Sequence, residues 1–114
     1  MNTFATTMES LIRRKIFATE EQASRELVRD YVLRQITSLQ QDLTRFEHKY
    51  GMSFERFGEY LHERSILLES GQLSPQQHQS LGQAIMLEED DWLEWKASLE
   101  MLDSWLGLRQ ETAV

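Results

Sequence analysis

Residues 32–50 read VLRQITSLQQDLTRFEHKY, and this stretch decides the fold of the chain. Its large apolar residues recur at alternating spacings of four and three, which is the heptad pattern of a helix that packs along another helix. No glycine or proline interrupts residues 20–50. We therefore predict one helix over this range, with an apolar seam along one side. The seam consists of Val32, Ile36, Leu39, Leu43, Phe46 and Tyr50.

Both ends of this predicted helix carry signals of a helix terminus. Thr19 can cap the first backbone N–H groups, and Gln22 follows three residues later as its capping-box partner. Gly51 stands after the last helical residue, where a left-handed conformation is favoured. The helix would be about 46 Å long, which is more than a single small core needs. We expect four further apolar residues to widen the seam at its N-terminal end: Leu27, Val28, Tyr31 and Leu33.

Two shorter helices should follow. Ser53 can cap the first of them and Gly71 ends it, while Ser74 and Pro75 open the second with a capping serine and a proline in the first turn. The expected buried side of the first consists of Phe54, Phe57, Tyr60, Leu61 and Leu68.

A final helix is predicted after the acidic run of residues 88–91, because carboxylates favour the positive end of the helix dipole. Gly107 should end this helix. We expect its apolar seam to pair with the first seam, within one chain or across a dimer. This second seam consists of Trp92, Trp95, Leu99, Leu102 and Leu106.

The predicted fold class is therefore all-α, a long helix with shorter helices in a hairpin or bundle. No alternating β-branched runs joined by Asn-Gly or Asp-Gly turns compete with it. Residues 1–18 are expected to be a weakly ordered N-terminal segment, residues 19–108 a single helical domain and residues 109–114 a tail. We also expect a homodimer with coiled-coil-like packing, since the long seam offers more apolar length than short helices can cover.

The charge of −7 is unevenly divided along the chain. Residues 1–50 carry +1 and residues 51–114 carry −8. An acidic half attracts basic protein surfaces and repels phosphate backbones, so we expect a protein partner and no direct nucleic-acid contact. There are no cysteines, and no stretch approaches the roughly 20 apolar residues that span a bilayer. We expect a cytoplasmic protein without a membrane partner.

The candidate partner-binding residues lie near the C-terminal end. Three tryptophans occur within fourteen positions, beside the densest negative charge. An exposed tryptophan among carboxylates can anchor a basic partner, although the same tryptophans could belong to the core. The predicted partner-binding set is Glu88, Glu89, Asp90, Asp91, Trp92 and Trp105.

No catalytic, cofactor or metal residue is assigned. All-helical nucleotide pyrophosphatases hold magnesium with a Glu-Glu-x-x-Glu motif followed by Glu-x-x-Asp. Glu88 and Glu89, with Glu100 and Asp103, resemble its pieces, but Trp92 occupies the third carboxylate position. We therefore expect a protein that is not an enzyme.

The middle of the chain resembles a family of small prokaryotic helical proteins that look like antitoxins. In that family a long helix ends in a Phe-Glu-x-Lys-Tyr-Gly-Met-Ser segment, and an acidic, tryptophan-containing helix follows. Here the matching segment is Phe46 to Ser53, preceded by similar sequence from Glu21 to Leu27 and from Asp30 to Leu33. The resemblance implies a protein that neutralises a basic toxin, without cofactor. A coiled-coil adaptor is the alternative reading, and a magnesium-dependent nucleotide pyrophosphatase is the third.

Overall fold

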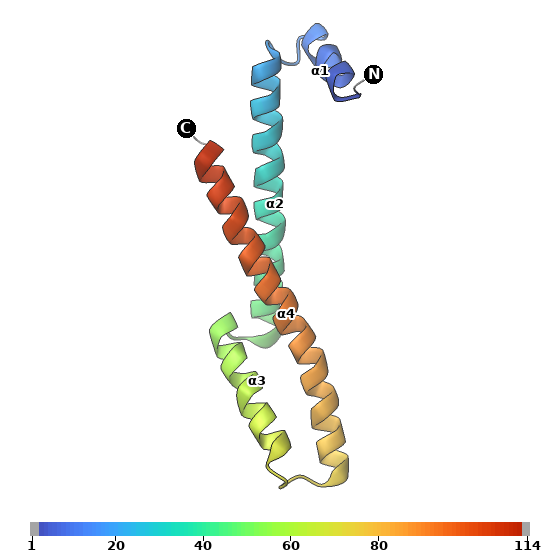
Figure 1. Ribbon diagram of the computed structural model, residues 1–114, viewed down its shortest axis with the longest axis vertical. Helices are drawn as coiled ribbons and strands as arrows, with labels where there is room; N and C mark the ends of the chain where they lie inside the picture. Colours follow the sequence, from blue (N-terminus) through green and yellow to red (C-terminus); the bar gives the residue numbers. More distant parts are fainter. Residues whose placement is uncertain (1–2, 113–114) are drawn as a thin grey trace.

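The computed structural model describes residues 3–112, and this part of the chain forms four helices joined by short connections (Figure 1). The all-α prediction is confirmed. The helices are α1 (Thr3–Arg13), α2 (Glu20–Tyr50), α3 (Phe54–Glu69) and α4 (Pro75–Thr112).

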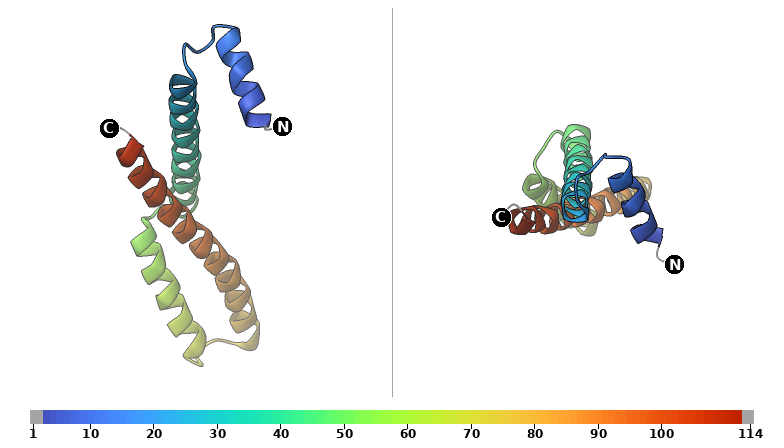
Figure 2. Two further views of the ribbon diagram at one scale, coloured as in Figure 1. Left: turned by 45° about the horizontal axis from the view of Figure 1, so that its top comes forward. Right: turned by 90° about the horizontal axis from the view of Figure 1, so that it is seen from above.

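The molecule is a rod with principal extents of 72 × 30 × 21 Å. The two long helices α2 and α4 run antiparallel and cross near the middle, while α3 and the first half of α4 form a hairpin at one end (Figures 1 and 2). Helix α1 packs on the N-terminal end of α2, where Met8 and Ala23 are both buried. The N- and C-terminal ends therefore lie at the same end of the rod, opposite the hairpin.

Three of the predicted helix starts, at Thr19, Ser53 and Ser74, are confirmed by their hydrogen bonds. The Gln22 N–H donates to Thr19 Oγ1 at 3.0 Å, and the Arg56 N–H donates to Ser53 Oγ at 3.2 Å. At the start of α4, Ser74 and Gln77 exchange two such bonds of 3.0 and 3.1 Å, which is a complete capping box.

The predicted seam of α2 is the side on which the chain buries its core. Five of its six residues are buried and Tyr50 is half-buried. The seam of α4 packs against the α2 seam within the same chain. Trp95 of α4 stacks on Phe46 of α2, with ring centroids 5.5 Å apart. A cluster of buried residues joins three helices around this contact. It consists of Leu43, Phe46, Phe57, Leu61 and Trp95.

The prediction of two separate helices between Ser74 and Gly107 is wrong. Residues 75–112 form one helix, and the acidic run of residues 88–91 lies in its interior. No glycine, proline or capping serine or threonine occurs from Gln83 to Ala97, so nothing interrupts the backbone hydrogen bonding. The helix also continues through Gly107 as far as Thr112. Residues 109–112 are therefore helical rather than a loose tail, and residues 113–114 lie outside the described part.

The predicted widening of the seam at its N-terminal end is also wrong. Leu27, Val28, Tyr31 and Leu33 are all exposed, with 41–57% of their surface accessible. Helix α4 diverges from α2 in this region (Figure 1), so no element of the described chain covers these side chains fully.

Candidate partner-binding surface

The acidic run on α4 is divided between contacts within the chain and exposure to solvent. Asp91 faces α2, where its Oδ2 lies 2.6 Å from Nζ of Lys49 and accepts a hydrogen bond from the Tyr50 hydroxyl. This carboxylate therefore fixes the register between α2 and α4 and is already occupied in the free chain.

The environment of Asp91 changes two pKa values. Burial alone would raise the pKa of Asp91, but hydrogen bonds from Lys49 and Tyr50 and the Lys49 charge outweigh it and lower the pKa below its usual value. The pKa of Tyr50 is raised by burial and by the hydrogen bond to Asp91. Asp91 is therefore ionised and Tyr50 neutral near neutral pH, so the contact is intact there.

Glu88 is also engaged within the chain, on the side of α4 that faces α3. Its Oε2 lies 3.1 Å from Nε of Arg64. Both atoms are shielded from solvent and neither has a hydrogen-bond partner with good geometry, so the contact is an ion pair held by charge. Arg64 also lies over the ring of Tyr60, 4.9 Å from its centroid.

Glu89 and Asp90 are both exposed. Asp90 lies on the outer face of α4, whereas Glu89 lines a pocket on the side of α4 that faces α3. Of the four predicted carboxylates, these two can therefore meet a partner without first breaking an internal ion pair.

The predicted tryptophans are packed to different degrees. Trp92 is half-buried and stacks on Phe54 with centroids 5.6 Å apart. Trp105 is half-buried and meets the exposed ring of Tyr31 edge to face at 5.8 Å. Trp92 therefore lies at the edge of the core, and Trp95 lies at its centre with 1% of its surface exposed. Trp105 packs outside this cluster, against Tyr31.

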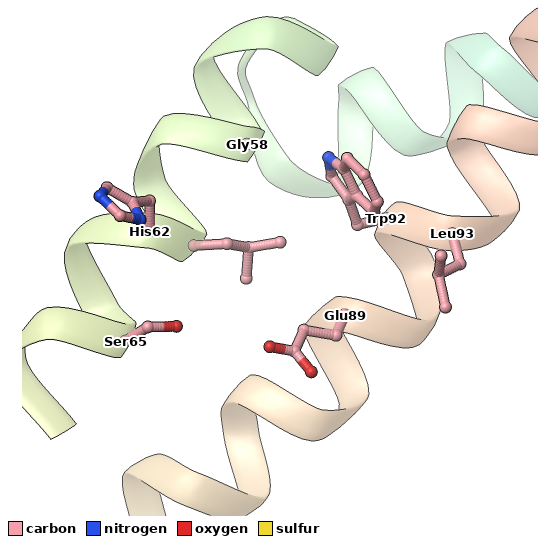
Figure 3. A pocket seen from close by; sticks show the side chains of 7 residues that line it. Gly58, His62, Ser65, Glu89, Trp92 and Leu93 are labelled. Carbon is pink, nitrogen blue, oxygen red and sulfur yellow. The ribbon is translucent and has the colours of Figure 1, made fainter. Parts of the chain in front are cut away.

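A pocket of about 350 Å³ opens between α3 and α4 beside Trp92. Figure 3 shows Ser65 on α3 and Glu89 on α4 reaching towards each other across it, with His62 along the α3 side. The indole nitrogen of Trp92 closes the upper end, 3.4 Å from where a Cβ on Gly58 would lie. A Cβ at residue 58 would therefore be in van der Waals contact with the indole.

Further exposed apolar side chains lie along the outer face of α4, and no sequence-based prediction included them as a binding surface. Met86, Leu93 and Met101 have 67%, 57% and 52% of their surface exposed. With Asp90, Ala97 and Ser104 they recur at steps of three and four along one face of the helix, although two successive steps of four, at Ala97, depart from the strict heptad of the seam. This second periodicity in residues 86–104 is the sequence signal from which the surface could have been predicted.

The magnesium-binding pieces do not come together in the described chain. Glu88 is paired with Arg64, and within residues 3–112 no three His, Asp or Glu side chains converge in a group suited to a metal ion. None of the helices in this same range is long and apolar enough to cross a membrane.

Comparison of the chain with protein-family models, with curated proteins and with solved structures finds no match.

Proposed function

We propose that this chain is an antitoxin-like protein-binding module, which neutralises a basic partner protein with the exposed acidic and apolar surface of α4. The observation that carries the proposal is the surface left uncovered. The chain exposes 8782 Å², whereas a compact monomer of 13.5 kDa exposes about 6,500 Å². Its radius of gyration is 22.6 Å, against about 13 Å for a compact domain of this length.

The excess surface is comparable to the area that one protein contributes to a large, permanent interface. Much of it is apolar, since thirteen large hydrophobic side chains are exposed in the described chain. Single exposed apolar residues are common, but a series along one helix is typical of an interaction surface. The charge of −8 on residues 51–114 favours a basic partner.

The coiled-coil adaptor is a weaker candidate because its working surface is already used. Five of the six α2 seam residues are buried by the chain's own helices. The 38-residue α4 is long enough to cover the seam, so the seam gives no reason for a second copy.

The proposal can be tested by capturing partners with the tagged full-length chain from its native cell extract. We expect one small basic protein, bound at about 0.05 M salt and released at about 0.5 M, where surface charges are screened. Co-expression should then restore growth to cells that produce the captured protein. Binding without restored growth would contradict the antitoxin role. Capture of only further copies of the chain would contradict the proposal that it binds a basic partner protein.

A further inference from the structure

Helix α4 carries apolar residues on two opposite faces, and only one of these faces is packed against the chain. The inner face contains Trp95 and its seam neighbours, which contact α2 and α3. A helix that is apolar on both sides is normally covered on both sides. Residues 86–104 of the outer face span about 27 Å, or five turns.

The outer face has the shape of a surface on which a second helix can pack. Positions 86, 90, 93, 97, 101 and 104 follow spacings of four, three, four, four and three. Ala97 and Ser104 are small, and together with Met101 and Trp105 they line a shallow hollow on the surface of α4. A large side chain of a docked helix can fill such a hollow as a knob fills a hole.

The negative charge around the outer face favours a basic helix over a second copy of this chain. Asp90 lies within the stripe, and the exposed carboxylates of Glu89, Glu94 and Glu100 border it. Lys96 is the one cation of this segment, and its Nζ lies over the ring of Trp92, 5.3 Å from the centroid. A second copy of α4 would place like charges against each other, which is unfavourable.

We propose that the outer face of α4, from Met86 to Ser104, is the docking site for an amphipathic helix of the basic partner. This docked helix presents a row of leucine-like side chains to the stripe and lysine or arginine on both flanks. The inference rests on the proposed function and adds the site and the form of the partner. Helix-in-groove recognition of this kind reads side chains at heptad spacing.

The first test uses a synthetic probe, so it does not require the natural partner. The probe is a fluorescent peptide of about three heptads with Leu and Ala at the apolar positions and Lys at the flanks. A control peptide has the same apolar residues and Glu at the flanks. We expect the Lys-flanked peptide to bind the full-length chain at least about tenfold more tightly in fluorescence anisotropy. Equal binding of the two peptides would overturn the proposal.

Matched variants locate the site. Leu93→Glu with Met101→Glu should weaken the Lys-flanked peptide about tenfold or more. Leu33→Glu with Ile66→Glu changes two residues of similar exposure on other helices and should leave its binding within about twofold. All variants alter exposed side chains, and unchanged circular dichroism would show that they fold. Equal loss in both pairs would overturn the location.

Capture from native extract with the same variants separates this proposal from the proposed function. A partner bound by wild type and lost with Leu93→Glu/Met101→Glu supports both. A partner retained by that variant leaves the proposed function intact and overturns the docking site. A wild-type dimer in sedimentation equilibrium that dissociates in the variant would show that a second copy covers the stripe, and would likewise overturn it.

Discussion

The indole of Trp95 lies nearly parallel to the ring of Phe46, with centroids 5.5 Å and planes 12° apart. This contact joins the two long helices near the point where they cross. Phe57 of α3 also reaches Trp95, with a centroid distance of 5.6 Å. One side chain therefore connects the three helices of the main core, which explains why Trp95 is almost completely buried.

Replacing Trp95 by alanine should be the most damaging aromatic truncation in the chain. We expect the free energy of unfolding to fall by about 3–5 kcal/mol, because the change removes a large buried ring and leaves a cavity. Trp105→Ala, at a half-buried position, should cost about 1 kcal/mol. Urea denaturation followed by circular dichroism measures both, and similar losses would contradict the central position of Trp95.

The ion pair of Asp91 should make stability depend on pH. Because the folded pKa of Asp91 is lowered, its contribution is fully present above the unfolded pKa of about 3.9 and is lost as the pH falls through the folded value. Asp91→Asn should therefore cost about 1 kcal/mol at neutral pH, and the difference from wild type should shrink below about pH 4. Asp90→Asn, at an exposed position, is the control and should change little.

Two glycines should respond in opposite directions to the same substitution. Gly51 has φ +65°, so Gly51→Ala strains the α2 terminus and should destabilise the chain by about 1 kcal/mol. Gly107 lies inside α4, and no atom lies within 4 Å of an added Cβ. Gly107→Ala should therefore raise stability by about 0.5–1 kcal/mol. Thermal melts of both variants test the prediction, and a stabilising Gly51→Ala would contradict it.

Charge reversal should distinguish exposed carboxylates from those used within the chain. Glu89→Lys with Asp90→Lys should weaken binding of a basic partner about tenfold or more and reduce its salt dependence. Glu9→Lys with Glu111→Lys makes the same change in net charge at exposed positions elsewhere and is the matched control. Equal weakening by both pairs in calorimetric titrations would indicate a net-charge effect without a defined site.

Reversing Asp91 is a less informative test of partner binding. The substitution would place a lysine beside Lys49, which now lies 2.6 Å from the carboxylate. We expect Asp91→Lys to lower stability by more than Asp91→Asn, because it adds like-charge repulsion to the lost ion pair. The melting temperatures of the two variants provide the comparison, and equal values would contradict an intact Lys49–Asp91 pair.

Local sequence signals predicted much of the fold because they have local causes. The α2 seam follows from heptad spacing, and the starts of α2, α3 and α4 follow from Thr19, Ser53 and Ser74. The helix start predicted at residues 88–91 is wrong because acidic residues stabilise a helix N-terminus but do not by themselves create one. In the folded chain Arg64 and Lys49 neutralise Glu88 and Asp91, so these carboxylates are accommodated inside α4.

The partner-binding residues were only partly predictable for a related reason. Composition identified the acidic, tryptophan-rich segment, but which side chains remain exposed depends on the rotation of α4 against α2 and α3. That rotation turns Asp91 and Trp92 inwards and Leu93 and Asp90 outwards. The spacing of the Trp95 seam carries this information, whereas the acidic, tryptophan-rich composition does not.

The 72 Å length of the rod has a consequence for hydrodynamic measurements. A single copy will have a larger hydrodynamic radius than a sphere of 13.5 kDa. It will therefore elute from a gel-filtration column before spherical standards of equal mass. Its elution will resemble that of a larger particle without any self-association. Static light scattering or sedimentation equilibrium, which report mass independently of shape, will therefore give the number of copies correctly.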